Sequence, residues 1–369
     1  MTHKYLLHLV AAARPNFVKV APLFHALSGD PDFAVRIVHT GQHYDVNLSE
    51  AFFTDLKLPA PDFHLEVGSG THAEQTGKVM ISYERVCLAE RPDWTVVVGD
   101  VNSTVAAALA STKLLIPVAH LEAGLRSRDR TMPEEINRLV TDAISDLLWT
   151  PSADADENLL REGVPESKID RVGNIMIDSY ELLKGQIESD CIVEKMGLTT
   201  TPYGFVTLHR PSNVDRRDSL ALLADQLVAV AKSVELVFPA HPRTRKMLED
   251  YDLIDAITSS PGIRLIEPLS YIQSMSLLTQ ASLVITDSGG LQEETTYLGI
   301  PCLTIRPNTE RPITIEKGTN KLVAAEHLAE EVAIAQSGEW PKGSKLDLWD
   351  GQTAHRCVRS LKKRLDGLV

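Results

Sequence analysis

Short apolar runs alternate with longer segments of helical periodicity along the whole chain, and this alternation predicts βαβ units and parallel sheets. In the first half, strands are predicted at 4–10, 34–40, 94–99, 116–121 and 146–150, and helices at 17–28, 74–90, 103–113, 133–145 and 155–163. The second half restarts the pattern, with strands near 203–208, 235–240, 263–266, 282–286 and 301–305 and helices near 216–232, 270–279, 290–298 and 325–337. Continuous apolar runs such as residues 94–98 are typical of strands covered on both faces.

Strand signals are weak between residues 181 and 202, so we predict a hinge there. The hinge separates an N-terminal Rossmann-like domain at 1–180 from a C-terminal one at 181–352. A basic, amphipathic helix at 353–369 is expected to join the N-terminal domain. The predicted fold class is therefore α/β, with two doubly wound domains facing a central cleft, and 369 residues suffice for both.

Polar side chains recur directly after the predicted strands of both halves. These positions are Arg14, Gln42, His43, Asp100, Glu122, His209, Arg210, His241, Arg243, Asp287, Ser288 and Arg306. In open parallel sheets, ligands bind outside the carboxyl ends of the strands. So many polar positions from both halves indicate a site rather than chance.

The segment from Asp287 to Glu294, Asp-Ser-Gly-Gly-Leu-Gln-Glu-Glu, carries the clearest chemical signal. It follows an apolar strand and opens a helix, whose first N–H groups and dipole can hold an anion. Ser288 is expected to cap this helix, while Gly289 and Gly290 let a phosphate approach the backbone. Glu293 and Glu294 can hold sugar hydroxyls, so the pattern predicts a nucleotide-sugar site.

Two basic residues near the N-terminus are further candidates for phosphate or substrate binding. Arg14 and Lys19 lie where the first strand gives way to a helix, with proline in the first helical turn. The simpler interpretation is an ordinary strand–helix junction with solvated charges.

Three carboxylates of the first half are candidates for proton transfer. Asp100 and Glu122 each follow an apolar strand, and Glu134 lies in the first turn of a predicted helix. A helix-start acid needs no further function, but a carboxylate buried at a strand end needs a partner, and Arg126 or a ligand can supply it. Clustered acids raise one another's pKa, which suits general acid–base chemistry.

His209, His241 and Arg311 are the remaining candidates, all in the second half. His209 opens the second half's site and can balance the charge of the acids, although a lone histidine is more often structural. Glu310 and Arg311 can form a surface ion pair of little consequence. Alternatively, Arg311 approaches a phosphate or an acidic partner within the site.

Composition and motif searches narrow the function classes. The formal net charge of −13 argues against general nucleic-acid binding, and no run of eighteen apolar residues predicts a membrane span. Four widely spaced cysteines, with no signal-peptide pattern, indicate reduced thiols in a cytoplasmic protein. The histidines form no metal-binding pair, and no dinucleotide fingerprint or Walker loop is present, so we expect neither metal nor cofactor.

The motifs, in this order, resemble those of the non-hydrolysing UDP-N-acetylglucosamine 2-epimerases. The matching segments are Thr40 to His43, Gly99-Asp100, His120 to Arg126, Pro133 to Arg138, Val172 to Asn174, His209-Arg210, His241-Pro242, Thr286 to Glu294 and Thr309 to Pro312. They cover most of the chain, from about residue 8 to about 325.

This resemblance implies a GT-B-like fold, a homodimer, and reversible conversion of UDP-GlcNAc to UDP-ManNAc for polysaccharide biosynthesis. The family route eliminates UDP to give 2-acetamidoglucal and then adds UDP back. Asp100, Glu122 and Glu134 match the family's proton-transfer acids, and His209 matches its active-site histidine. The positions that match those holding UDP or the sugar are Arg14, Lys19, Ser288, Gly289, Gly290, Glu294 and Arg311.

Several departures from the family pattern keep alternatives open. Ala12-Ala13 replaces Gly-Thr, Asn16 replaces an acid, and Pro211 to Asn213 replaces Arg-Glu-Asn near a regulatory site of some bacterial members. Ser274 stands where the family often has an aromatic residue. The alternatives are a 2-epimerase of a modified sugar such as UDP-2,3-diacetamido-glucuronate, a hydrolysing epimerase, a GT-B glycosyltransferase, and a nucleotide-sugar-binding regulator without catalysis.

Overall fold

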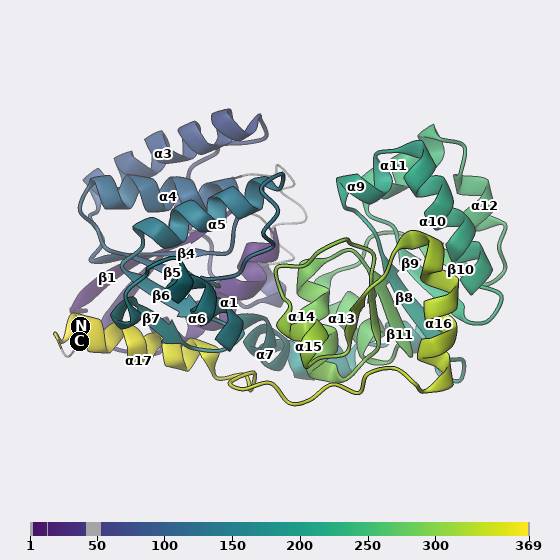
Figure 1. The fold of residues 1–369 in the computed structure, drawn as a ribbon. Helices are drawn as coiled ribbons and strands as arrows, with labels where there is room; N and C mark the ends of the chain where they lie inside the picture. The colour runs from purple at the N-terminus through teal and green to yellow at the C-terminus, as the bar shows by residue number, and fades with distance from the viewer. Residues whose placement is uncertain (1–2, 13, 42–52, 368–369) are drawn as a thin grey trace. The chain divides into compact units, whose positions relative to one another are not determined.

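The computed structural model of the chain describes residues 3–12, 14–41 and 53–367, and these form two compact units. The N-terminal unit comprises Met1–Leu182 with Asp347–Val369, and the C-terminal unit comprises Leu183–Leu346. The chain therefore returns to the first unit at its end. In Figure 1 the last helix, α17 (Thr353–Leu365, yellow), lies against the N-terminal unit and packs beside α1 (Arg14–Ser28).

The N-terminal unit is built on a seven-stranded sheet with strand order β3-β2-β1-β4-β5-β6-β7. Its strands are β1 (Tyr5–Ala11), β2 (Phe33–His39), β3 (Phe63–His64), β4 (Trp94–Val98), β5 (Val118–Leu121), β6 (Leu147–Thr150) and β7 (Ile169–Arg171). All neighbours pair in parallel, and β1 aligns Tyr5 to Ala11 with Phe33 to His39. All the carboxyl ends therefore lie along one edge, as the sequence predicted.

Helices cover both faces of this sheet, and its strands β4, β5 and β6 are buried along their whole length. The helices are α1, α3 (His72–Ala89), α4 (Asn102–Lys113), α5 (Pro133–Ile144), α6 (Ala153–Arg161), α7 (Ile175–Ser189) and α17. Helices α3, α4 and α5 pack side by side above the sheet, with α1 and α17 below it (Figure 1). Val10, Val97 and Val118 of the strands meet Tyr83 and Ala107 of α3 and α4 in a buried core.

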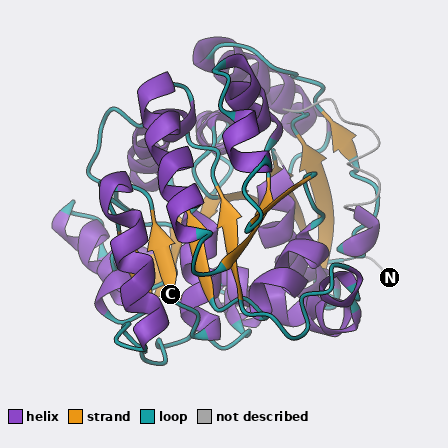
Figure 2. Ribbon diagram, turned by 90° about the vertical axis from the view of Figure 1, so that its right-hand side faces the viewer, coloured by secondary structure: helices purple, strands orange, loops and turns teal. Residues whose placement is uncertain are grey.

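The C-terminal unit repeats the design on a six-stranded parallel sheet with order β10-β9-β8-β11-β12-β13. Its strands are β8 (Tyr203–Thr207), β9 (Glu235–Pro239), β10 (Ile263–Ile266), β11 (Leu283–Thr286), β12 (Cys302–Thr304) and β13 (Asn320–Leu322). Its helices are α8 (Ile192–Lys195), α9 (Pro211–Val214), α10 (Arg217–Val230), α11 (Pro242–Asp250), α12 (Ile254–Thr258), α13 (Tyr271–Thr279), α14 (Gly289–Leu298), α15 (Ile313–Glu316) and α16 (Leu328–Ser337). Figure 2 shows these strands running in one direction between helices.

The structure confirms the predicted α/β class and the predicted strands and helices to within a few residues. The segment 181–202, predicted as a hinge, is largely helical, since α7 continues through residue 189 and α8 follows at Ile192–Lys195, and the two units divide within it at Leu182 and Leu183. The short strands β3, β7 and β13 were not predicted. Two or three residues carry no periodicity, and such strands form only because a neighbouring strand offers them a ladder.

Candidate active site

The candidate acids of the N-terminal unit lie at the carboxyl ends of two neighbouring strands. Asp100 follows β4 after Gly99, whose φ is +70°, and Glu122 follows β5 with a φ of +71°. A non-glycine residue with such a φ costs of order 1–3 kcal/mol and persists only where its surroundings hold it. The Glu122 backbone is therefore fixed in a conformation that it would not adopt by itself.

Lys19 is the partner of the Glu122 carboxylate. Its ammonium nitrogen lies 2.5 Å from Glu122 Oε2, and Glu122 is 5% exposed. The second oxygen, Oε1, is also buried and accepts no hydrogen bond from the residues that the structure describes. One oxygen is thus held by a cation while the other stays free to exchange a proton.

Arg126, which the sequence suggested as a partner for Glu122, pairs with other acids. Its guanidinium lies 2.7 Å from Asp142 and 2.6 Å from Glu162. The expectation was wrong because Arg126 points toward α5 and the end of α6, while Lys19 arrives at Glu122 from α1.

Arg138 of α5 forms an ion pair with the Asp100 carboxylate, which is about one-third exposed. Asn137 donates a hydrogen bond of 2.8 Å to the backbone carbonyl of Asp100. The second turn of α5 therefore grips Asp100 by both side chain and backbone. The sequence placed Arg138 in the segment Pro133 to Arg138 but did not indicate its partner. Its spacing of four from Glu134 puts both residues on one helix face.

The two adjacent glutamates at the start of α5 differ completely in environment. Glu135 is 2% exposed and accepts hydrogen bonds from the backbone N–H groups of Ser127 and Arg128 and from the Arg138 side chain. Burial alone would raise the pKa of Glu135, but these hydrogen bonds outweigh it and hold the pKa below its usual value. Within the described ranges, Glu134 makes no hydrogen bond or ion pair and is partly exposed. Glu134 is therefore the one free to meet a substrate.

In the C-terminal unit, Ser288 occupies the N-cap position of α14, between β11 and the helix. Its side chain makes no capping hydrogen bond, so the predicted capping role was wrong. Its own N–H is already bonded to Thr286 Oγ1 at 2.9 Å. The next amides, of Gly289 and Gly290, have no acceptor within the helix and carry the positive end of its dipole. These amides are therefore donors that can bind an anion at this turn.

Arg311 packs directly on this helix start. A Cβ atom at Gly289 would lie 2.6 Å from Arg311 Nη1, so no larger residue fits there without moving the guanidinium. Arg311 is 6% exposed and pairs with Glu310 and Glu293, and Glu310 also pairs with Arg306 at 2.8 Å. The interpretation of Glu310 and Arg311 as a surface ion pair was therefore wrong.

The Asp287 carboxylate orients His209. The sequence placed Asp287 in the Asp287–Glu294 segment but did not predict this contact. His209 Nδ1 lies 3.0 Å from Asp287 Oδ1, and the same carboxylate accepts the backbone N–H groups of His209 and Arg210. Burial raises the pKa of Asp287, but these hydrogen bonds and one from Asn213 outweigh it and lower the pKa. An ionised Asp287 accepts a hydrogen bond from His209 Nδ1–H, which leaves Nε2 of His209 to contact a ligand.

Two further candidates complete the C-terminal set. His241 caps α11 by accepting the Arg243 N–H at 3.2 Å, and its ring lies 5.8 Å from that of His209. Glu294 is 3% exposed and accepts a hydrogen bond of 2.7 Å from the Tyr271 hydroxyl. Tyr271 is thus a supporting residue that the sequence patterns did not indicate.

Three side chains that the sequence singled out lie outside the part of the chain that the structure describes. Arg14 begins α1, but its side chain is outside the described part, and so are Gln42 and His43. The described residues contain no group of three or more histidine, cysteine or acidic side chains suited to a metal ion. In the same part of the chain, no helix is long and apolar enough to cross a membrane.

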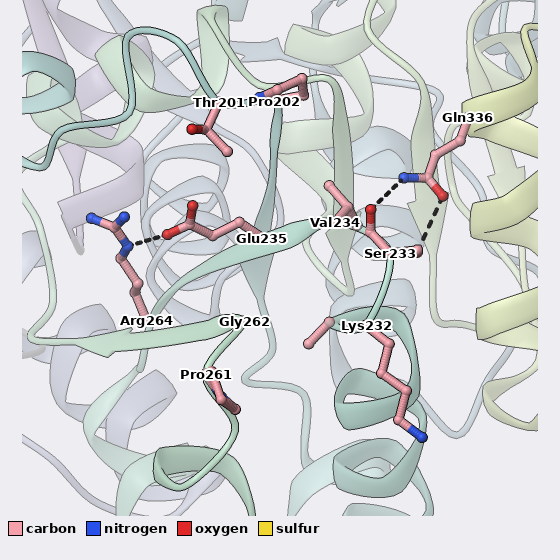
Figure 3. A pocket seen from close by; sticks show the side chains of 11 residues that line it. Thr201, Pro202, Lys232, Ser233, Val234, Glu235, Pro261, Gly262, Arg264 and Gln336 are labelled. Carbon is pink, nitrogen blue, oxygen red and sulfur yellow. Dashed lines mark hydrogen bonds and ion pairs between the residues drawn. The ribbon is translucent and has the colours of Figure 1, made fainter.

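A cavity of about 620 Å³ lies in the C-terminal unit at the amino ends of its strands. The candidate residues His209 and Ser288 lie at the opposite, carboxyl ends. The cavity is lined by residues at the amino ends of β8, β9 and β10, among them Thr201, Glu235 and Arg264. Figure 3 shows Arg264 turned onto Glu235, and Gln336 bonded to Ser233 at the rim. Arg264 and Glu235 thus pair with each other, and the lining contains none of the predicted site residues.

Comparison with known proteins agrees with this arrangement. The family model described as UDP-N-acetylglucosamine 2-epimerase matches residues 25–362. The UDP-N-acetylglucosamine 2-epimerase of Methanocaldococcus jannaschii is 42% identical, with 96% of this chain and 98% of that protein covered. The UDP-2,3-diacetamido-2,3-dideoxy-D-glucuronate 2-epimerase of Pseudomonas aeruginosa is 38% identical, with 96% and 98% covered.

Solved structures give the same result. The crystal structure of the Methanocaldococcus jannaschii UDP-GlcNAc 2-epimerase in complex with UDP-GlcNAc and UDP matches with a TM-score of 0.89 and 41% identity, covering 97% of this chain and 99% of that one. The Neisseria meningitidis UDP-GlcNAc 2-epimerase bound to UDP-GlcNAc matches with a TM-score of 0.88 and 27% identity, covering 97% and 100%. The chain therefore belongs to the UDP-N-acetylglucosamine 2-epimerase family, with its GT-B-like fold.

Proposed function

We propose that this protein is a non-hydrolysing UDP-GlcNAc 2-epimerase that interconverts UDP-GlcNAc and UDP-ManNAc. The observation that carries the proposal is the state of Glu122, a strand-end carboxylate buried against Lys19 with one oxygen unpartnered among the described residues. A buried acid in that state is suited to exchanging a proton with a substrate carbon. Family membership supplies the substrate class.

The N-terminal domain, 1–180 with the C-terminal helix, supplies the acids in this proposal. Removal of the C2 proton accompanies departure of UDP from C1, which leaves 2-acetamidoglucal. Return of a proton to the opposite face of C2, with UDP oxygen adding back to C1, gives the epimer and restores both bonds. Removing a proton from one face of C2 and returning one to the other face needs more than one acid or base. Asp100, Glu122 and Glu134 provide three.

The C-terminal domain, 181–352, holds UDP. The amides of Gly289 and Gly290 and the guanidinium of Arg311 supply donors for the diphosphate, which develops charge as the C1–O bond breaks. Ser288 and Glu294 hold polar groups of the nucleotide or sugar, and His209 with His241 faces the same edge of the sheet. Arg14 and Lys19 bind substrate from the N-terminal domain.

One experiment tests the reaction against its alternatives. Pure protein is incubated with UDP-GlcNAc in D₂O and followed by NMR. Epimerisation yields UDP-ManNAc with deuterium at C2, whereas free ManNAc with UDP indicates a hydrolysing enzyme. An unchanged sugar contradicts the proposal. A parallel reaction with UDP-2,3-diacetamido-2,3-dideoxy-D-glucuronate tests the substrate of the Pseudomonas aeruginosa relative, and faster conversion of that sugar would replace UDP-GlcNAc as the substrate.

We further propose that the protein is a cytoplasmic homodimer. Three large apolar side chains are exposed on or just after helices α3 and α4: Ile81 in the middle of α3 at 54%, Leu88 near its end at 69%, and Leu115 after α4 at 85%. All four cysteines are free thiols, which suits a reducing compartment. Light scattering should give twice the chain mass of 40.6 kDa. A lysine at both Ile81 and Leu88 should shift the mass toward the monomer, and a monomeric wild type contradicts the dimer.

A further inference from the structure

His120 is a buried histidine whose two ring nitrogens both face acceptors. It lies on β5, two residues before Glu122, and is 0% exposed. Nε2 lies 2.8 Å from the backbone carbonyl of Gly99, which can only accept, and Nδ1 lies 2.6 Å from Asp142 Oδ1. Because a carbonyl only accepts, the ring donates at Nε2, and its Nδ1 faces the Asp142 carboxylate.

Asp142 is the fixed point of this arrangement. Its carboxylate is 2% exposed and accepts the Gly124 N–H at 3.0 Å and Arg126 at 2.7 Å, besides His120. Burial raises the pKa of Asp142, but His120 and Arg126 outweigh it and keep the pKa below its usual value. One carboxylate thus binds the chain two residues before Glu122 and two residues after it.

The same contacts reach the other acids. The His120 bond to the Gly99 carbonyl ties the β5 loop to the turn that presents Asp100. On α5, Glu134, Arg138 and Asp142 follow one another at intervals of four and share a face of the helix. Arg138 holds the Asp100 carboxylate directly, and Asp142 holds the Glu122 loop, so one helix face is connected to all three acids.

We propose that Asp142 and His120 are positioning residues for the reaction, which act by holding the strained Glu122 loop and the Gly99 turn in register. This rests on the proposed function of the acids. Glu122 keeps a φ of +71° only while its flanks are fixed. A catalytic carboxylate displaced by about 1 Å loses rate on the order of 100-fold, although the binding groups are untouched.

The test compares two variants with a matched control. Asp142→Asn removes the charge that His120, Gly124 and Arg126 share, and His120→Asn removes the donor to Gly99. The control is Asp178→Asn, since Asp178 is a 5% exposed carboxylate of the same unit that accepts two backbone N–H groups at the start of α17. Each folded variant is assayed for kcat, for KM with UDP-GlcNAc, and for UDP affinity by calorimetry.

Both site variants should lose kcat on the order of 100-fold, with KM and UDP affinity changed by less than about threefold. Asp178→Asn should lower the melting temperature and keep kcat. If Asp142→Asn does not fold, His120→Asn carries the test. If the wild type is active and the folded site variants keep a near-normal kcat, the positioning role is wrong while the proposed function stands. An equal loss of kcat in Asp178→Asn would also refute the positioning role. An inactive wild type refutes the proposed function instead.

Discussion

The Lys19 ammonium nitrogen lies 2.5 Å from Glu122 Oε2, and both side chains are largely buried. Lys19 comes from α1, which follows β1, and Glu122 comes from the loop after β5, and only β4 separates these two strands in the sheet. Removing a charge that faces a buried opposite charge leaves the remaining one uncompensated. Loss of either member of this pair should therefore lower both the free energy of unfolding and the reaction rate.

Lys19→Met should therefore destabilise the protein by about 3 kcal/mol and also lower kcat. Urea unfolding and steady-state kinetics measure the two effects. The matched control is Lys246→Met, which breaks the exposed pair with Asp250 on α11 and should leave stability nearly unchanged. Equal effects in both variants would contradict the role of burial.

Asp100→Asn and Glu122→Gln should each reduce epimerisation by about 10²- to 10⁴-fold, because each removes a proton-transfer group and keeps its shape. UDP affinity should persist, since the residues proposed to hold the diphosphate, Gly289, Gly290 and Arg311, lie in the C-terminal unit. Turnover is followed by NMR and binding by calorimetry. Glu157→Gln, which loses only an exposed pair with Arg161, serves as control. A variant of either acid with a near-normal rate would refute its assignment.

Asp287→Asn should lower kcat on the order of 100-fold. Three donors hold the new amide oxygen at the Oδ2 position, so its NH2 group faces His209 Nδ1 and makes that nitrogen an acceptor. The pKa of Asp287 lies below its unfolded value, so its contribution to stability is present above about pH 4 and is lost as pH falls through the folded pKa. Urea unfolding between pH 3 and 7 should show a shallower acid loss in the variant. Asp250→Asn should keep the wild-type kcat and acid profile.

Gly289→Ala should weaken UDP binding by at least about tenfold, because the new Cβ atom would meet Arg311 at 2.6 Å and Glu310 at 2.7 Å. Those atoms belong to buried ion pairs with little freedom to move. Calorimetric titration with UDP measures the loss. Gly77→Ala on α3, where nothing lies within 4 Å of the added atom, should instead raise stability by up to about 1 kcal/mol and leave binding intact.

His8 should make the protein sensitive to mild acid. The ring is 0% exposed, and burial lowers its pKa from 6.5 to about 4, so the fold holds it neutral. Its contribution is complete above about pH 6.5 and is lost as pH falls toward 4, by about 3 kcal/mol in total. His8→Phe, which keeps ring contacts with Phe63 and Tyr83, should flatten the stability curve between pH 7 and 4.5. Parallel curves for the two proteins would rule out this role.

By itself, the sequence determined the α/β class, the longer strands and helices, and the placement of Asp100, Glu122 and the Asp287–Glu294 segment after strands. Those features are local, because periodicity and residue type act over one element. Tertiary structure decided the partners: Lys19 rather than Arg126 for Glu122, across 103 residues, and Asp142 for His120. It also decided that Glu135 is structural while Glu134 is free, and that Arg311 is buried against Gly289. Pairing and burial depend on distances in space, and no spacing along the chain encodes them.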